Sequence, residues 1–235
     1  MRRLIFLLVS VLLAACEGGT LRVLPAEDWD SESPGSQVSS AEFREISRAV
    51  GKAARTECLR QSGNRNCDFT IMVDLNPRAP ENAFQTLDDD GQPVIIFTQT
   101  MINSAKNADE LAFVMGHEAA HHVLGHLARQ SNNSQESAVI FGDLARLDGG
   151  DDADVEAWQK LGAQVGVQAY VKDFELEADQ LGTVITYRAG YNPLVGAVYF
   201  NRIPDPGDKF LGTHPPNAQR VQIVQETARQ LGLTP

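Results

Sequence analysis

Two histidines and a glutamate in the middle of the chain have the spacing of a metal site. The segment is an HExxH motif and reads His117-Glu118-Ala119-Ala120-His121. Residues four apart lie one above the other on a helix, so both imidazoles can reach one Zn²⁺ at about 2.0–2.1 Å. Glu118 is rotated by about 100° around the helix, which leaves it free to act as a general base on water. The motif predicts a zinc-dependent peptidase; the alternative is a buried polar cluster with structural partners.

A catalytic zinc also needs a third protein ligand and one open position. Further along the chain, Glu175 and Asp179 are four residues apart on one helix face, and Glu177 points elsewhere. We expect Glu175 to bind zinc and Asp179 to accept a hydrogen bond from a ligand imidazole, which fixes the tautomer of that ring. By itself this acidic helix is more typical of a solvated surface, and only the upstream HExxH motif favours the metal.

A second histidine pair competes for the metal. His122 and His126 are also four residues apart, on a different face of the same helix. No glutamate follows His122, so this pair lacks a base. We predict that His122 lies at the surface or supports a ligand, and that His126 is structural.

The elements that must position these side chains follow from periodicity and turn signals. Asn107-x-x-Glu110 is typical of a helix start, and apolar residues surround most of the helix that runs to about Gln130, so we expect it to be buried. Residues 131–154 are polar and acidic and predict an exposed excursion. The other expected elements are helices at 39–59, 155–189 (interrupted near Gly162 and Gly166), 192–202 and 217–231, and strands at 69–75, 83–87 and 93–98. The predicted fold class is α+β, mostly helical with a small β-sheet, in one domain over residues 40–235.

The N-terminus has the pattern of a secretory signal. Residues 1–15 combine a short basic head with an apolar run that is too short to span a bilayer. Leu13-Ala14-Ala15-Cys16 is typical of a bacterial lipobox and predicts lipidation of Cys16; the alternative is an ordinary signal with a chance cysteine. Residues 16–39 are rich in Gly, Ser, Pro and acids and predict a flexible tether. Glu17 after the cysteine favours the outer membrane, with the domain facing the periplasm.

The composition of the chain limits its possible binding partners and indicates the redox state of its cysteines. The formal net charge of the 235-residue chain is −11, which gives no electrostatic reason to bind nucleic acid. Anionic headgroups should repel it as well, so membrane attachment would depend on the lipid anchor alone. Cys58 and Cys67 close a short loop, and in an oxidising compartment they predict a disulfide; the alternative is two buried free thiols.

HExxH followed by ExxxD resembles the gluzincin family of HtpX and the CAAX prenyl endopeptidases, in particular its soluble periplasmic lipoprotein branch with LoiP and the protease domain of BepA. The resemblance covers about residues 40–231. Further blocks occur in the same order: Asn82-Ala83-Phe84, Asp109-Glu110-Leu111-Ala112, Gly125-His126, Ala189-Gly190-Tyr191-Asn192-Pro193, and Thr213-His214-Pro215-Pro216 with Arg220.

The resemblance implies a zincin-type metallopeptidase domain that binds Zn²⁺, with Glu175 and not Glu177 as the third ligand. It also suggests that His214 faces the metal, where it either steadies an oxyanion or occupies the fourth site and holds the enzyme latent. The alternative for His214 is a helix-start residue with no catalytic part. Arg220 is expected to pair with Asp179.

Together, motif and resemblance predict a zinc-dependent endopeptidase of the bacterial envelope that cleaves unfolded or misassembled envelope proteins. We expect the substrate to lie extended along Val94–Thr98, held by main-chain hydrogen bonds. Two alternatives stay open: a non-proteolytic zinc lipoprotein that acts as an outer-membrane assembly factor, and a peptidase that His214 keeps latent.

Overall fold

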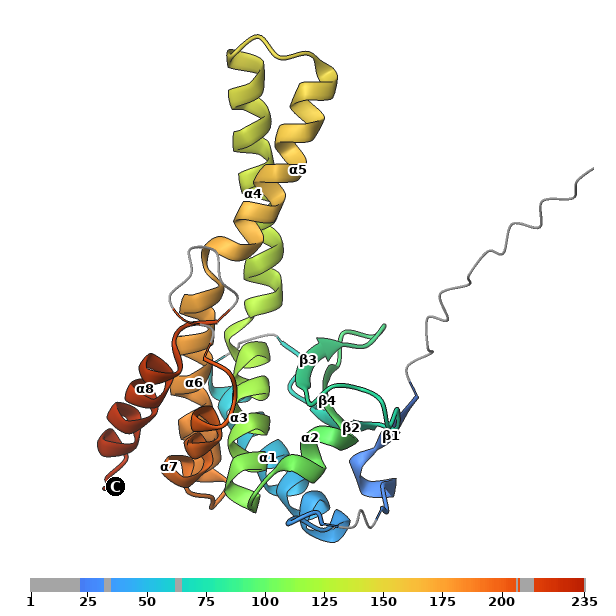
Figure 1. Ribbon diagram of the computed structural model, residues 1–235, viewed down its shortest axis with the longest axis vertical. Helices are drawn as coiled ribbons and strands as arrows, with labels where there is room; N and C mark the ends of the chain where they lie inside the picture. The colour runs from blue at the N-terminus through green and yellow to red at the C-terminus, as the bar shows by residue number, and fades with distance from the viewer. Residues whose placement is uncertain (1–21, 32–34, 62–64, 206, 208–213, 235) are drawn as a thin grey trace, which may run out of the picture.

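The computed structural model describes residues 22–31, 35–61, 65–205, 207 and 214–234. In these residues the chain is mostly helical with one four-stranded sheet, which confirms the predicted α+β class (Figure 1). The strands are β1 (Val23–Pro25), β2 (Thr70–Asp74), β3 (Ala83–Leu87) and β4 (Pro93–Thr98). The helices are α1 (Ser40–Gln61), α2 (Gln99–Ser104), α3 (Ala108–Leu124), α4 (His126–Leu147), α5 (Asp152–Ala169), α6 (Val171–Arg188), α7 (Pro193–Gly196) and α8 (Asn217–Gln230), with 3₁₀ turns η1 (Ala26–Asp28) and η2 (Ala197–Asn201).

The strand order of the sheet is β1-β2-β4-β3. β2 and β4 pair in parallel, whereas β3 and β4 form an antiparallel hairpin with Gly91 at a φ of 76° in its turn. β4 therefore lies inside the sheet, with its main-chain groups paired to both neighbours. The prediction that Val94–Thr98 offers a free edge is wrong for this reason, and β3 is the edge strand beside α3 (Figure 1).

The first described residues belong to the domain and not to a flexible tether. β1 pairs with β2 in antiparallel fashion, and Trp29 is buried with its ring centroid 5.6 Å from that of Phe43. Val38 is buried as well. The prediction of a flexible tether over residues 16–39 is therefore wrong for the described residues 23–29. The signal segment 1–15 and Cys16 lie outside the described residues, so both stay predictions.

α3 and α6 form the centre of the helical layer. α3 is buried around most of its circumference, as predicted, but it ends at Leu124 because Gly125 adopts a left-handed φ of 69°. The two helices approach closely where each carries a glycine. A Cβ on Gly182 would lie 2.8 Å from the main-chain nitrogen of His117, and one on Gly116 would lie 2.9 Å from the Gly182 carbonyl oxygen. This close approach lets a side chain of α6 reach the histidines of α3.

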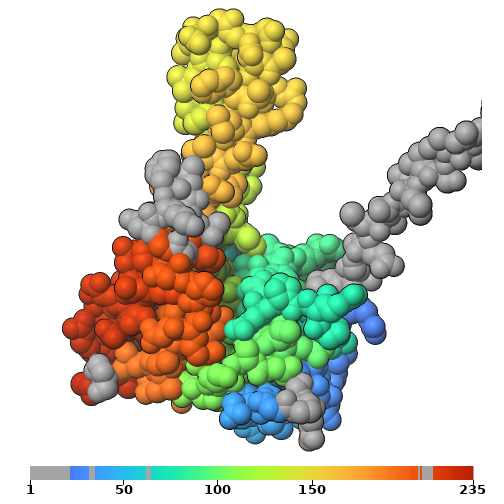
Figure 2. Space-filling model, in the orientation of Figure 1, coloured from blue at the N-terminus to red at the C-terminus, as the bar shows by residue number. Residues whose placement is uncertain are grey.

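α4 and α5 form an antiparallel hairpin that projects from the rest of the molecule (Figure 2). We call this hairpin the arm. Residues 131–154 are mostly exposed, which agrees with the predicted excursion, but they are largely helical. The predicted helix interruption at Gly162 and Gly166 is wrong, since the break falls at Tyr170. Both glycines instead pack against α4, where a Cβ on Gly166 would lie 2.2 Å from the Asn133 carbonyl oxygen.

The remaining predictions about the framework agree with the structure. A disulfide joins Cys58 at the end of α1 to Cys67. The helices expected at 39–59 and 217–231 correspond to α1 and α8, and the one expected at 192–202 to α7 with η2. In the described part of the chain, every helix is too short or too polar to cross a bilayer.

Candidate active site

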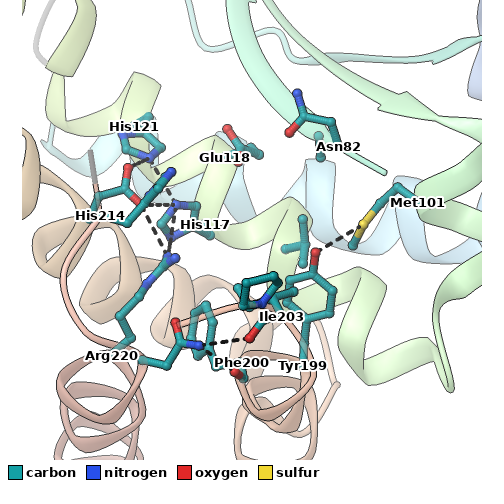
Figure 3. A pocket seen from close by; sticks show the side chains of 15 residues that line it. Asn82, Met101, His117, Glu118, His121, Tyr199, Phe200, Ile203, His214 and Arg220 are labelled. Atoms are coloured by element: carbon teal, nitrogen blue, oxygen red, sulfur yellow. Dashed lines mark hydrogen bonds and ion pairs between the residues drawn. The ribbon is translucent and has the colours of Figure 1, made fainter. Parts of the chain in front are cut away.

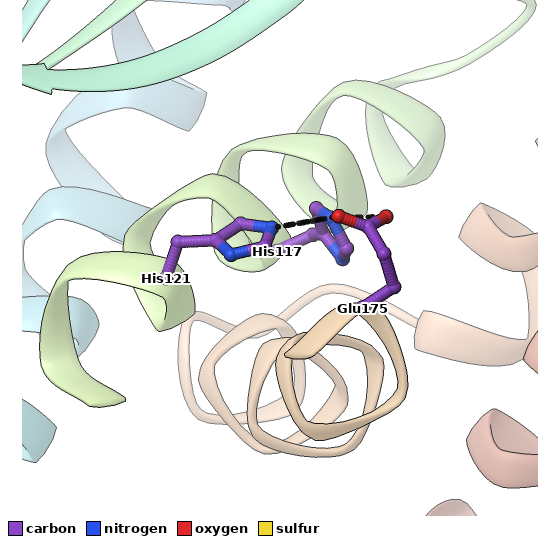
Figure 4. Close-up of side chains that lie close together, drawn as sticks. All are labelled: His117, His121 and Glu175. Atoms are coloured by element: carbon purple, nitrogen blue, oxygen red, sulfur yellow. Dashed lines mark hydrogen bonds and ion pairs between the residues drawn. The ribbon is translucent and has the colours of Figure 1, made fainter. Parts of the chain in front are cut away.

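The three predicted metal ligands converge from two helices. His117 and His121 lie one turn apart on α3, and Glu175 reaches them from α6 (Figure 4). The Nε2 atoms of the two histidines are 3.0 Å apart. Glu175 places one carboxylate oxygen 3.6 Å from His117 Nε2 and the other 3.4 Å from His121 Nε2. His117 and Glu175 are buried, so this cluster of donors lies at the base of a cleft and not on a solvated surface.

The chemistry and spacing of these donors fit zinc. Ligand atoms about 2.0–2.1 Å from a tetrahedral Zn²⁺ are roughly 3.3 Å from one another, close to the separations found here. Two imidazoles and one carboxylate also leave one of the four positions open for water or substrate. Burial lowers the pKa of His117, but the Asp179 and Glu175 carboxylates outweigh it and raise that pKa to about 10. The surroundings of this ring therefore favour a positive charge next to it.

Asp179 and Arg220 fix the orientation of the first histidine. The Asp179 carboxylate lies 2.9 Å from His117 Nδ1 and accepts two hydrogen bonds of 2.7 Å from the Arg220 guanidinium. Asp179 is fully buried, and Arg220, which comes from α8, also lies 3.4 Å from Glu175. With Nδ1–H donating to Asp179, the Nε2 lone pair of His117 is available to a metal. The predicted pairing of Arg220 with Asp179 is present.

A second chain of contacts holds the other histidine, and sequence reasoning missed it. His121 Nδ1 lies 2.8 Å from His126 Nδ1, and His126 Nε2 lies 3.1 Å from Glu177, which is in turn 2.5 Å from Arg129. Burial, followed by the charge of His121, lowers the pKa of His126 to about 4, so its ring is neutral at pH 7. A neutral ring that donates from Nε2 to Glu177 must accept at Nδ1. His121 then donates from Nδ1 and has its Nε2 lone pair free to bind a metal.

His126 should therefore matter for metal affinity and not only for packing. In His126→Phe the ring can keep its stacking on Phe174, whose centroid is 4.6 Å away, but the acceptor for His121 is lost. We expect the Kd for zinc to rise about 10- to 100-fold, measured by competition with a chromogenic chelator. His122→Phe is the matched control. The buried His122 ring binds the Asn66 carbonyl oxygen at 2.7 Å, away from the donor cluster, so this variant should lose stability but keep its zinc affinity.

Glu118 points to the opposite side of the donors, toward the sheet (Figure 3). Its Oε2 accepts a hydrogen bond of 3.0 Å from the main-chain N–H of Gln85 on β3. Burial raises the pKa of Glu118, although the neighbouring His117 and His121 oppose that shift. A carboxylate with a raised pKa, close to the metal ligands but outside the donor set, is suited to take and return a proton.

The donor cluster lies between two apolar ends of one cleft. Both ends include Glu118, His121 and Glu175. Apolar residues at the first end are Met101, Val114, Tyr199, Phe200 and Ile203, and those at the second are Phe84, Leu127, Val171 and Phe174. His214 lies at the first end, half-exposed, with Nδ1 3.0 Å from Glu175 (Figure 3). The structure thus brings the predicted metal ligands and their predicted neighbours Glu118, Asp179, His214 and Arg220 together around one point.

An α+β domain with an HExxH helix, a glutamate from a second helix and an adjoining edge strand is of the metallopeptidase class. The comparison with protein families agrees, because the model of peptidase family M48 matches residues 40–228. The chain belongs to this family, which confirms the predicted relationship.

Two curated relatives illustrate the similarity. The beta-barrel assembly-enhancing protease of Escherichia coli (strain K12) is 24% identical over 150 residues, which cover 58% of this chain and 31% of that protein. The mitochondrial metalloendopeptidase OMA1 of Arabidopsis thaliana is 26% identical over 137 residues, which cover 57% of this chain and 27% of that protein. The matches thus span about a third or less of the relatives' own length.

Proposed function

We propose that this protein is a zinc-dependent endopeptidase, with His117, His121 and Glu175 as metal ligands and Glu118 as general base. The observation that carries the proposal is the geometry of the three donors. Their atoms all lie within 4.8 Å of one another, and each imidazole has its other nitrogen held by a neighbouring residue. Such support is typical of metal-binding histidines.

The metal and the residues around it would have different roles in peptide hydrolysis. Bound zinc would lower the pKa of a coordinated water toward 7 and polarise the scissile carbonyl. Glu118 accepts the proton of the attacking water and delivers it to the leaving amine. Glu118 lines both ends of the cleft, where it can reach a bound substrate.

We propose that the substrate lies extended beside β3. Asn82 and Ala83 line one end of the cleft, and Phe84 and Gln85 line the other, so this strand runs past the donor cluster. An edge strand can pair with an extended peptide through main-chain hydrogen bonds. Such pairing depends on the backbone of the substrate more than on its side chains, so it suits unfolded polypeptides of varied sequence.

His214 is proposed to steady the oxyanion that forms from the scissile carbonyl. Its Nδ1 contacts Glu175, which leaves Nε2 for the half-exposed side of the cleft. We expect His214→Ala to lower kcat on the order of 10²-fold with zinc content unchanged, measured on the same unfolded substrate. A rise in activity would instead mean that the ring blocks the open position and keeps the enzyme latent.

The proposed setting is the bacterial envelope, with Cys16 lipidated and the domain in the periplasm at the outer membrane. The pattern of residues 1–16 supports export and lipidation, and the disulfide between Cys58 and Cys67 suits an oxidising compartment. A similar protein carries the name beta-barrel assembly-enhancing protease. We propose that the substrates are unfolded or misassembled envelope proteins.

Zinc analysis with a digestion assay tests the proposed function. The purified chain is expected to hold one zinc and to cleave a reduced, alkylated protein; removal by a chelator should abolish cleavage, and added zinc should restore it. A protein that binds zinc and the unfolded chain but never cleaves it would be an assembly factor, and the proposal would be wrong.

A further inference from the structure

The arm carries an apolar face that the rest of the molecule leaves uncovered. Eight of the thirteen exposed large hydrophobic side chains among the described residues lie on the arm or at its base. Leu147 near the tip is 85% exposed, and Trp158 on α5 is 45% exposed. Soluble proteins seldom concentrate apolar side chains in this way unless the surface binds something.

These side chains share one side of the hairpin. Ile140, Leu144 and Leu147 follow the i, i+4, i+7 spacing of a single stripe on α4. Leu144 and Trp158 line the same surface depression near the tip, which joins the stripe of α4 to that of α5. Leu161 lies three residues from Trp158 and extends the α5 stripe toward the base. We call these five residues the arm face.

Apart from Trp158, the arm face lies outside the contact that holds the hairpin together. Small residues bring α4 and α5 close together, with Gly142 against the Gln159 side chain and Gly162 against the Ser137 carbonyl oxygen. Trp158 also packs across this contact, with its ring centroid 6.1 Å from that of Phe141. A Cβ on Gly162 would lie 2.5 Å from that oxygen, so the helices are as close as backbone packing allows. The other large apolar side chains, and the exposed part of Trp158, therefore stay at the flanks, where only a further molecule can cover them.

Carboxylates border the apolar side chains at the tip. The arm, residues 126–169, contains seven acidic and three basic residues. All three bases are already paired, Arg129 with Glu177, Arg146 with Asp143 and Lys160 with Glu156. Asp148 and Asp154 line the same depression as Leu144 and Trp158. A ligand of the arm face should combine apolar side chains with positive charge, which disfavours a second copy of this acidic chain.

The arm begins at the proposed active site. Leu127 and Gln130, in the first turns of α4, line the second end of the cleft together with Glu118 and His121. From Leu127 to Leu147 the helix rises about 30 Å. An extended polypeptide spans that distance with about nine residues. A chain bound in the cleft can therefore continue onto the arm.

We infer that the arm face is a second binding site for the polypeptide substrate. It takes a segment rich in aliphatic and basic residues, about nine or more residues from the scissile bond. The inference rests on the proposed peptidase function and deepens it by naming the class of substrate. Two sites on one chain raise the effective concentration of the scissile segment at the cleft, so long substrates bind more tightly than short ones.

Binding is tested first without any cleavage, in the full chain carrying Glu118→Gln. The probe is a 12-residue peptide of leucine and lysine, with leucine–glutamate and serine–lysine peptides as controls. Since the other tryptophan, Trp29, is buried, Trp158 reports on the arm face by fluorescence. We expect only the leucine–lysine peptide to shift its emission to the blue. An equal shift with the leucine–glutamate peptide, with phosphatidylethanolamine vesicles alone, or on dimerisation seen by sedimentation would overturn the inference.

Kinetics then tests the coupling to the cleft. A cleavage site mapped in a reduced, alkylated protein supplies an 8-residue core, made alone and within 24-residue peptides that carry a leucine–lysine or a leucine–glutamate extension. We expect the leucine–lysine extension to lower KM at least tenfold with kcat unchanged. The triple variant Ile140→Gln, Leu144→Gln, Leu147→Gln should lose that gain and still cleave the 8-residue core normally.

Val139→Gln is the matched control, because Val139 is 59% exposed on α4 but lies outside the stripe. It should leave the gain intact, and thermal unfolding should show that all variants are folded. Equal effects of the triple variant on short and long peptides would overturn the inference. If the wild-type chain cleaves nothing while the Trp158 shift persists, the peptidase proposal fails and the binding surface stands.

Discussion

Replacing Glu118 by Gln should lower kcat/KM by about 10²- to 10⁴-fold while the protein keeps its zinc. The amide preserves the size of the side chain and can still accept the hydrogen bond from the Gln85 N–H. What it loses is the ability to take a proton from the attacking water. Zinc binding should survive because Glu118 is not one of the three converging donors.

The measurement is cleavage of a reduced, alkylated protein by wild type and variant, together with zinc per chain from emission spectroscopy. Thermal unfolding serves as the control for folding. If the variant retains more than a tenth of the wild-type rate, Glu118 is not the general base. A variant that is inactive because it lost its zinc would instead place Glu118 among the ligands.

The donor cluster could be predicted from sequence because its information is local. His117 and His121 share a helix face through spacing alone, and so do Glu175 and Asp179. The two pairs meet only because α3 packs against α6. That they would meet could be predicted from the HExxH motif and the family resemblance, not from spacing. The structure adds the reason for this packing: Gly116 and Gly182 let the two helices approach.

The support of His121 could not be predicted in the same way. A helix continued through Gly125 would separate His121 and His126 by 500°, and so put them on different faces. The left-handed Gly125 ends α3 and starts α4 in a new direction, which returns His126 to His121. One backbone dihedral thus decides which side chains touch, and spacing rules that assume a continuous helix miss it.

The arm and β1 were missed because composition was weighed above periodicity. Residues 131–154 contain Ser, Asn and Gly, which are typical of loops. Yet Ser134, Phe141 and Ala145 recur at helical spacing on the side that meets α5. β1 has three residues only, and its pairing with β2 depends on a partner almost 50 positions away in the chain. Such a strand carries too little local pattern to stand out from a polar segment.

The two glutamates of α6 should differ strongly in their contribution to zinc binding. Glu175→Gln should weaken zinc binding more than 100-fold, whereas Glu177→Gln should weaken it only about tenfold. Glu175 contacts both histidines directly, and contacts with His117, His121 and His214 hold its pKa well below the usual range despite burial. An amide at this position lacks the negative charge of the carboxylate and is a weaker metal ligand.

Glu177 is the matched control because it has the same side chain, two residues away on the same helix. Its carboxylate faces His126 and Arg129, so it acts on the metal only through the orientation of His121. Chelator competition measures both constants, and cleavage at buffered zinc should follow them in the same order. Equal losses in the two variants would mean that α6 contributes a general negative field, and Glu175 would no longer be the third ligand. A tenfold or larger difference in the expected direction requires a specific donor, because a shift of two residues along the helix changes the field of a charge far less than it changes which atom touches the metal.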